Sequence, residues 1–306
     1  MKKNLILGVI DNYGFEQLKK FVYSIRATSF QGDVILFAGQ SLSPLTIRML
    51  RKYGIQMRFF NGVAVLPEGN LAAQRFAFRQ PINYFNFRHY LYYDFLHRNS
   101  GEYEKILLSD IRDVYFQDDP FSFEMGEELY CAIEGPRVIR DCNYNGPWMR
   151  YIYGDAALEQ LGGNRISCAG STWGKEAAIK DYLERMLQEI VKVPDAKIAI
   201  DQAIHNYLIY THALPDVKFL YNDGGVILTL SYEKNYVIGE DGKVRVSGDK
   251  LVKMLHQFDR YPDLKALTDK QFMGHPFPAL VRKYFYKADL HLHKLMMKTG
   301  LRRLSV

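Results

Sequence analysis

Two aspartates in the middle of the chain follow an apolar segment and could bind a metal ion. Residues 106–108 are apolar without alternation, as expected of a central strand buried on both faces, and Asp110 and Asp113 come soon after them. In open α/β sheets, ligands bind beyond the carboxyl ends of the strands. Paired carboxylates are oxygen ligands that suit Mg²⁺ or Mn²⁺. A charged turn capped by the same aspartates is the alternative, and the pattern alone leaves both open.

Polar residues at the ends of other expected elements are further candidates. His256 follows the largely apolar residues 251–255, and Asp201 begins a helix expected over residues 201–211. Each has a plain structural alternative: a packed core histidine for His256 and a helix-capping carboxylate for Asp201. Arg88 lies in an aromatic-rich helix expected over residues 81–96. It is either a fixed cation for a ligand or one partner of a salt bridge on the helix surface.

Hydrophobic periodicity predicts the elements that must position these residues. Strands are expected at residues 5–10, 32–38 and 55–59, separated by helices over residues 15–28 and 45–53. Such alternation predicts a parallel sheet covered by helices, an α/β fold.

The second half of the chain continues with less regular signals. Residues 129–135 read as a strand, and residues 136–164, rich in Gly, Asn and Tyr, as an ordered loop or small subdomain suited to substrate contacts. A strong amphipathic helix follows RISCAGSTWG. Its expected buried face is Ile179, Tyr182, Leu183, Met186, Leu187 and Ile190. Asp241-Gly242 within YVIGEDGKVRV predicts a hairpin with a type I′ turn.

The composition of the 306 residues is that of a globular protein, with 48% hydrophobic and 24% charged residues. The net charge of +6 suits an acidic partner such as a nucleotide, an anionic glycan or a membrane surface, but no long basic stripe suggests nucleic acid. The three cysteines follow no metal-ligand spacing and fit a reducing cytoplasmic setting. The first apolar run ends at Asp11, too soon for a signal peptide, and no segment approaches the ~18 apolar residues of a membrane span.

Taken in order, several segments resemble the nucleotide-sugar-dependent glycosyltransferases of the GT-A fold. The matching segments are INYFNFRHYLYYDFL, LLSDIRDVYFQDDPF, ISCAGSTWG, DQAIHNYLI and MLHQFDR. The resemblance implies a GT-A domain over residues 1–262, which is a Rossmann-like, mixed and mostly parallel sheet with helices on both faces. The resemblance thins after about Pro262, so residues 263–306 are expected to form a basic helical extension packed on or beside this domain.

The same resemblance implies which residues form the site. Asp113, Asp110 and His256 would hold Mn²⁺ or Mg²⁺ on the diphosphate of the donor. Asp201 and Gln202 would contact the donor sugar or activate the acceptor. The remaining expected donor contacts are Asp11, Asn12, Tyr13, Arg88, Asp110, Ala169, Gly170 and Ser171. Some of these residues have structural alternatives to a donor contact. Asp11 and Asn12 could equally form a simple turn. Tyr13 could pack in the core, and Gly170 could be an ordinary turn glycine.

One departure from the family pattern concerns the two aspartates. The commonest motif is Asp-x-Asp, whereas this chain has Asp-x-x-Asp. If the aromatic segment that follows sets the register, Asp113 takes the last, metal-ligating position, and Asp110 takes the other only if the turn carries an extra residue. Asp113 is therefore the firmer prediction of the two.

The resulting prediction is a metal-dependent glycosyltransferase that moves a sugar from a nucleoside-diphosphate sugar, with a UDP-sugar favoured, to a hydroxyl of a glycan or lipid-linked acceptor. Surface glycan or lipopolysaccharide synthesis would suit it. Retention of the anomeric configuration is weakly favoured over inversion. The alternatives are a sugar-1-phosphate nucleotidyltransferase, which needs a Gly-rich phosphate loop that VIDNYGFEQL does not provide, and a non-catalytic nucleotide-sugar-binding relative.

The C-terminal segment from residue 277 onward is basic and aromatic and leaves two interpretations open. It is either a solvated helix face or an attachment site for an anionic membrane surface, which would make a cytoplasmic protein peripheral on the cytoplasmic face of a membrane. Its basic residues include Lys283, Lys287, Lys294, Lys298, Arg302 and Arg303.

Overall fold

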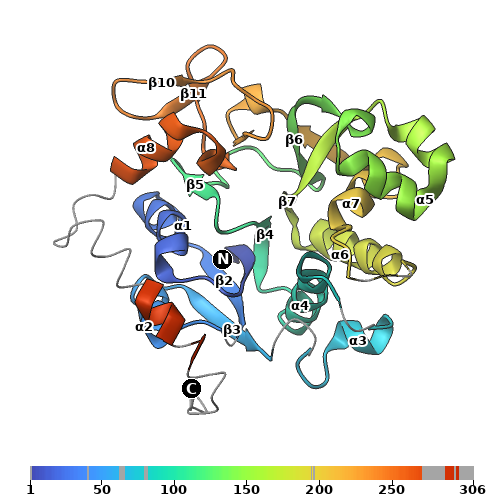
Figure 1. Cartoon of the computed structure of the whole chain (residues 1–306), viewed down its shortest axis with the longest axis horizontal. Coiled ribbons are helices and arrows are strands. Elements are labelled where there is room, and N and C mark those ends of the chain that lie inside the picture. Colours follow the sequence, from blue (N-terminus) through green and yellow to red (C-terminus); the bar gives the residue numbers. More distant parts are fainter. Residues whose placement is uncertain are drawn as a thin grey trace.

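A seven-stranded sheet forms the centre of the protein in the computed structural model (Figure 1). The structure describes residues 2–39, 41–61, 66–78, 82–193, 195, 197–270, 287–292 and 294–295. The sheet has the strand order β3-β2-β1-β4-β7-β6-β8. Its strands are β1 (Lys3–Ile10), β2 (Asp33–Gly39), β3 (Gln56–Phe60), β4 (Tyr103–Ser109), β6 (Leu129–Val138), β7 (Arg165–Lys175) and β8 (Val217–Leu220).

Most of this sheet is parallel. Strands β3, β2, β1 and β4 pair in parallel, and so do β6 and β8. Strand β7 lies between β4 and β6 and is antiparallel to both, so it alone of the seven runs the other way. The predicted α/β fold with a mixed, mostly parallel sheet is confirmed.

Helices cover both faces of the sheet. They are α1 (Phe15–Ala27), α2 (Pro44–Lys52), α3 (Leu71–Arg75), α4 (Tyr84–Arg98), α5 (Asn145–Leu161), α6 (Glu176–Ile190), α7 (Asp201–Tyr210) and α8 (Pro262–Lys270). Alternate residues of β1 pack in different clusters because side chains of a strand alternate between its faces. Leu5 and Leu7 pack with α4, α6 and α7, whereas Ile6 and Ile10 pack with α1 and α2. The predicted apolar face of α6 is buried as expected.

A predicted helix and a predicted loop segment differ from the elements observed. Helix α4 begins at Tyr84, because the side chain of Asn83 accepts a hydrogen bond from the amide of Phe85 at 3.0 Å and caps the helix. The segment 136–164, expected to be a loop or small subdomain, is largely helical and contains α5. Gly154, with φ of 82°, breaks this helix, and its inner side packs on a small apolar cluster that includes Ile139 and Met149.

A second, three-stranded sheet joins distant parts of the chain at the end of the main sheet. Strand β13 (Met254–His256) pairs antiparallel with β5 (Val114–Phe116) and parallel with β9 (Ile227–Thr229). Because of this pairing, the residues that follow β4 lie beside the end of β13. The two segments with the expected metal ligands therefore meet.

The third sheet contains the predicted hairpin. Strand β10 (Val237–Ile238) pairs antiparallel with β11 (Val244–Val246), which also pairs with β12 (Lys250–Leu251). The prediction of a type I′ turn at Asp241-Gly242 is wrong. Ile238 pairs with Val244, so the loop spans residues 239–243, and within it only Gly242 has a positive φ, of 70°.

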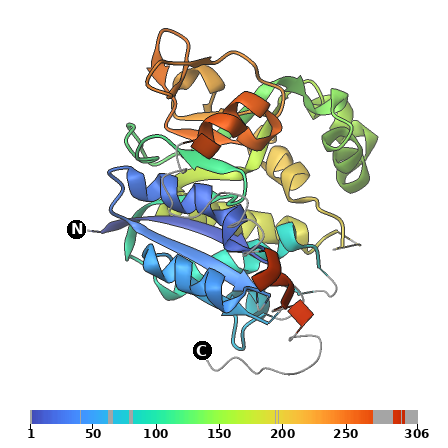
Figure 2. The same cartoon turned by 60° about the vertical axis from the view of Figure 1, so that its left-hand side comes forward.

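The chain after residue 262 continues into α8, which packs on the small sheets. Leu264 is buried, and Lys20 of α1 forms an ion pair with Asp269 at 2.8 Å. Figure 2 shows α8 and the strands around residue 245 (orange) stacked above α1 (dark blue). In the part of the chain that the structure describes, no helix is long and apolar enough to cross a membrane.

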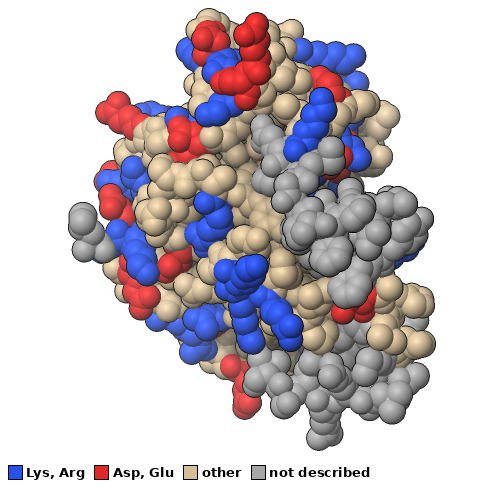
Figure 3. All heavy atoms as spheres, turned by 90° about the vertical axis from the view of Figure 1, so that its left-hand side faces the viewer, with Lys and Arg blue, Asp and Glu red and all other residues tan. Residues whose placement is uncertain are grey.

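The basic C-terminal segment is described only in part. Residues 287–292 are helical, and Lys287 and Lys294 are among the described residues, whereas Lys283, Lys298, Arg302 and Arg303 lie outside them. On the face shown in Figure 3, lysine and arginine side chains spread over the middle, and aspartate and glutamate lie nearer its left edge and top. Helix α2 exposes Arg48, Arg51 and Lys52. Membrane attachment stays a prediction.

Candidate metal and substrate site

The three expected metal ligands meet where β4, β5 and β13 come together. Asp110 follows β4, Asp113 precedes β5, and His256 ends β13. His256 pairs with Val114, and the amide of Gln257 donates to the carbonyl of Asp113 at 2.7 Å. One ligand atom from each of Asp110, Asp113 and His256 lies within 4.8 Å of the others. The geometry is that of a three-ligand group, and we call these residues the acidic triad.

The chemistry of the acidic triad fits a divalent cation. The His256 ring is fully buried, and its Nδ1 lies 3.3 Å from Ser171 Oγ and 3.7 Å from Cys168 Sγ. Its Nε2 is buried and makes no hydrogen bond to any residue that the structure describes, although Asp110 Oδ2 lies 3.5 Å and Asp113 Oδ1 3.9 Å away. A buried polar atom without a partner is costly. A cation bound by two carboxylates and one imidazole, as Mn²⁺ is in proteins, would satisfy it.

The triad is electrostatically coupled. Burial raises the pKa of Asp113. Burial has the same tendency at Asp110, but His256 and Arg88 outweigh it and lower the pKa of Asp110 to about 2. Burial lowers the pKa of His256, but Cys168 and the two carboxylates outweigh it and raise that pKa well above its ordinary value. The site therefore attracts positive charge.

Gly170 of β7 makes room for this group. A Cβ atom at position 170 would overlap with the carboxylate of Asp110 and would lie 3.0 Å from Cε1 of His256. The carbonyl of Gly170 also accepts a hydrogen bond from the amide of Asp110 at 2.7 Å. Glycine is needed here because two side chains of the triad approach the strand backbone closely.

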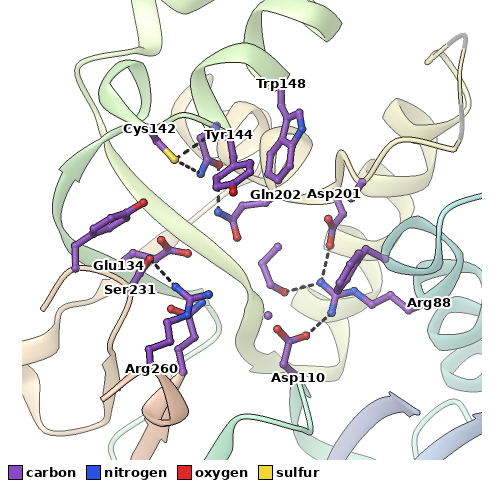
Figure 4. Close-up of a pocket in the computed structure, with 17 residues that line it drawn as sticks. Arg88, Asp110, Glu134, Cys142, Tyr144, Trp148, Asp201, Gln202, Ser231 and Arg260 are labelled. Carbon is purple, nitrogen blue, oxygen red and sulfur yellow. Dashed lines mark hydrogen bonds and ion pairs between the residues drawn. The ribbon is translucent and has the colours of Figure 1, made fainter. Parts of the chain in front are cut away.

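Arg88 of α4 connects the triad to the neighbouring pocket. Its Nη1 donates to Asp110 Oδ1 at 2.7 Å, and its Nη2 donates to Asp201 Oδ2 at 2.6 Å and to the carbonyl of Ala169 at 3.4 Å (Figure 4). Arg88 is almost fully buried, so the surface salt bridge considered from the sequence is wrong. Burial raises the pKa of Asp201 although Arg88 opposes this.

Two pockets meet at Arg88 and Asp110. The first pocket, of about 230 Å³, is lined by Val9, Tyr13, Tyr84, Phe85, Arg88, Ser109, Asp110, Ile111, Arg112 and Asp113. The second pocket, of about 280 Å³, is shown in Figure 4 and also contains Phe85, Arg88 and Asp110. Its other lining residues include Glu134, Tyr144, Trp148, Ala169, Gly170, Asp201, Gln202, Ser231 and Arg260. Asp110 therefore lines both of two adjoining pockets, Asp113 lines the first, and the buried His256 lines neither.

The other expected site residues differ in which pocket they line. Tyr13 lines the first pocket, whereas Ala169, Gly170, Asp201 and Gln202 line the second. Ser171 lines neither pocket, and its side chain contacts His256. Gln202 donates from Nε2 to Asn145 Oδ1 at 3.2 Å, so its side chain is held in place within the second pocket.

Asp11 and Asn12 are occupied in a local turn. Asp11 accepts hydrogen bonds from Ser41 and, at 2.9 Å, from the side chain of Asn12. Asn12 has φ of 58°, and its amide donates to Ser41 Oγ at 2.6 Å. Neither residue lines the two pockets. The turn considered from the sequence is present, and a direct role in binding stays a prediction.

Several pocket residues escaped the sequence interpretation. Glu134 is the one charged residue in the apolar run of β6 before Gly135. A charged residue at the end of an apolar strand is also the signal that marks Asp110. Tyr144 and Trp148 lie in the segment expected to contact substrate, but nothing in that segment distinguishes them from its other aromatics. Tyr84 and Phe85 begin α4 and read as core aromatics.

Comparison with known proteins adds no assignment. No protein-family model matches the sequence, and no curated protein matches it. The function must therefore be argued from the acidic triad, the two pockets and the sheet around them.

Proposed function

We propose that the protein is a metal-dependent glycosyltransferase of the GT-A fold that uses a nucleoside-diphosphate sugar, with a UDP-sugar favoured. The observation that carries this proposal is the Asp110, Asp113 and His256 group at the point where two pockets adjoin: Asp110 lines both pockets and Asp113 lines the first. A donor of this class has a nucleoside and a sugar on either side of a diphosphate. It needs a cation site flanked by two spaces, which is the arrangement seen here.

The sheet supports the same proposal. Asp110 follows the carboxyl end of β4, which is where open α/β sheets bind ligands. The neighbouring strand β7 is reversed, so Ala169 and Gly170 approach this end from the opposite direction. The expected GT-A resemblance and the geometry thus favour the same edge of the sheet.

Each part of the site has a role in this proposal. Tyr13 and the first pocket take the nucleoside, and Asp201 and Gln202 in the second pocket take the sugar. Mn²⁺ or Mg²⁺ held by Asp110, Asp113 and His256 would neutralise the charge that develops on the diphosphate as it leaves. Arg88 is a fixed cation beside the same position, and preorganised charge of this kind contributes much of the catalysis in such sites.

Asp201 and Gln202 favour retention as the proposed stereochemistry, whereas Glu134, the other carboxylate of the second pocket, is the candidate base of an inverting enzyme. An inverting enzyme needs a carboxylate that is free to take the proton of the acceptor hydroxyl. One oxygen of Asp201 is bonded to Arg88, whereas Gln202 is held toward the pocket by Asn145. The pair is better suited to position the donor sugar than to deprotonate an acceptor.

The two alternatives predict different behaviour. A nucleotidyltransferase would form a nucleotide sugar from a sugar 1-phosphate, and its Gly-rich phosphate loop has no counterpart in the turn at Asp11 and Asn12. A non-catalytic relative would bind UDP and metal but release no sugar. Measurement of sugar release therefore separates both alternatives from a transferase.

The first experiment is a thermal-shift panel of UDP, GDP and CMP with and without Mn²⁺. A ligand at ~100 times its Kd adds roughly 2.7 kcal/mol to the free energy of unfolding, which gives a shift of several degrees. We expect the largest shift with UDP and Mn²⁺ together. If no nucleotide gives a metal-dependent shift, the proposal is wrong.

A matched pair of variants then tests the metal ligands. Asp113→Asn removes a charge from the triad and should abolish metal-dependent hydrolysis of UDP-sugars. Asp118→Asn is the control, because Asp118 lies in the same acidic segment but pairs with Lys253 at 3.1 Å outside the triad. Equal activity of the two variants would remove Asp113 from the site.

A further inference from the structure

The second pocket extends beyond the space next to the triad. In Figure 4, Arg88, Asp110 and Asp201 lie at one side, Glu134, Ser231 and Arg260 lie at the other, and Tyr144 and Trp148 lie along the top. This far side comes from β6, α5 and the segments around β9 and β13, none of which contributes to the first pocket. It has no assigned role in donor binding.

Two aromatic residues at the start of α5 form an exposed shelf on this pocket. The rings of Tyr144 and Trp148 lie 5.7 Å apart and are tilted by 39°. Tyr144 is 64% exposed, which is unusual for so large a ring and leaves its face available. Aromatic rings with polar edges combine an apolar face with hydrogen-bonding capacity, which suits a ligand that is apolar on one face and hydroxylated at its edges.

Glu134 adds a buried carboxylate to the far side of the pocket. It is 4% exposed yet lines the pocket. Burying a carboxylate is costly, and the strand position would otherwise suit an apolar residue. Next to it, Arg260 Nη1 donates to Ser231 Oγ at 3.1 Å. Convergent polar groups in a partly aromatic pocket are typical of sites that orient a hydroxyl-rich ligand.

A further pocket continues from this far side. It has a volume of about 580 Å³ and shares Ser231 and Tyr232 with the second pocket. The guanidinium of Arg137 lies 3.8 Å from the centre of the Tyr232 ring, so the two side chains form a flat, polar-edged surface. The other lining residues are Pro136, Asp141, Lys234 and Tyr261. The two pockets are therefore parts of one cleft that leads away from the triad.

We propose that this cleft binds a carbohydrate acceptor at least two sugar units long. The sugar that receives the transferred group would lie between Glu134 and the shelf of Tyr144 and Trp148, and the next sugar would lie on the surface of Arg137 and Tyr232. The inference rests on the proposed glycosyltransferase function and adds the class of the acceptor. A small alcohol, a lone monosaccharide or a lipid tail would leave the outer pocket unused.

Direct binding is the first test. The labelled full-length protein is applied with UDP and Mn²⁺ to an array of neutral and acidic oligosaccharides, and the thermal shift by UDP and Mn²⁺ is measured on the same sample. We expect retention on one group of glycans. A normal thermal shift without retention on any glycan would overturn the acceptor proposal alone, whereas loss of the thermal shift would overturn the donor proposal.

The length of the acceptor is tested by fluorescence with a retained glycan. The chain has two tryptophans, of which Trp173 is fully buried and Trp148 lines the pocket, so a change in emission reports on the shelf. The terminal disaccharide of the glycan and the methyl glycoside of its terminal sugar are titrated in parallel. We expect tighter binding of the disaccharide, and equal affinities would overturn the two-unit cleft.

Variants separate the inner and outer parts of the cleft. Tyr144→Ala should weaken both ligands by about threefold to tenfold, the range expected for a lost aromatic contact. Arg137→Ala should weaken only the disaccharide. Tyr151→Ala is the control, because Tyr151 is a 49% exposed tyrosine of α5 that lines neither pocket. If Tyr144→Ala behaves like Tyr151→Ala, or Arg137→Ala weakens both ligands equally, the proposal is wrong.

Discussion

Gly170 lies so close to Asp110 that any side chain at position 170 would overlap with the aspartate carboxylate. The contact joins β7 to the end of β4, which are neighbours in the sheet. It explains why a glycine occupies a buried strand position, where the missing side chain otherwise weakens packing. The proposed metal site therefore depends on a residue that supplies no ligand atom.

Gly170→Ala should displace Asp110 and His256 and greatly reduce the thermal shift produced by Mn²⁺. Overpacking of this kind costs about 1–3 kcal/mol, so the variant should still fold. Gly163→Ala is the matched control, since the nearest atom to its added Cβ would be 3.6 Å away. A Mn²⁺ shift of unchanged size in Gly170→Ala would contradict the arrangement of the triad.

Ser171→Ala should weaken metal binding without removing a ligand. Ser171 Oγ lies 3.3 Å from His256 Nδ1, and a proton held on Nδ1 leaves the Nε2 lone pair free to bind the cation. Loss of such a partner costs about 10- to 100-fold in metal affinity. Calorimetric titration with Mn²⁺ measures the change, and an affinity equal to that of the unaltered protein would show that Ser171 does not orient the ring.

Arg88→Met should destabilise the protein strongly, because it leaves Asp110 and Asp201 buried without their shared cation. Removal of one partner from a buried ion pair costs about 3–5 kcal/mol. Arg98→Met is the control on the same helix, since Arg98 is about half exposed, and surface pairs such as its pair with Asp94 contribute about 0–1 kcal/mol. Urea unfolding measures both variants, and similar losses would mean that the buried bridge contributes little.

A pH dependence follows from a buried histidine that is not part of the triad. His205 is fully buried, and its two ring nitrogens lie 2.9 Å from Ser167 Oγ and Tyr182 Oη. Burial, with Arg88 nearby, lowers the pKa of His205 from 6.5 to about 3. The unfolded chain therefore binds a proton below pH 6.5 that the folded protein does not, and stability falls as the pH drops from 6.5 toward 3.

The slope for one such histidine approaches about 1.4 kcal/mol per pH unit. His205→Gln should reduce the slope of unfolding free energy against pH between pH 6 and 4 by roughly this amount. His212→Gln, at an exposed histidine, is the control. The comparison uses slopes because His205→Gln also loses buried hydrogen bonds at every pH. If the free energy of unfolding has the same slope against pH in the unaltered protein and in both variants, His205 is protonated in the folded protein.

The sequence by itself determined the elements of the α/β fold and the residue types of the site. Periodicity is local, so the apolar faces of α1 and α6 and the buried run of β4 can be recognised without knowledge of their neighbours. Periodicity could not show that residues 145–161 are helical, because Gly154 interrupts the pattern and the helix is stabilised by packing on a small cluster that includes Ile139 and Ile166.

The resemblance grouped Asp110, Asp113 and His256, but only the tertiary structure shows why these and the other site residues lie together. Asp113 and His256 are far apart in the chain and meet because β5 pairs with β13. Arg88 became a buried bridge because α4 packs where β4 ends and α7 begins, and Glu134 became a pocket residue through the placement of β6. Such contacts depend on strand pairing and helix packing over long separations, and no local spacing encodes them.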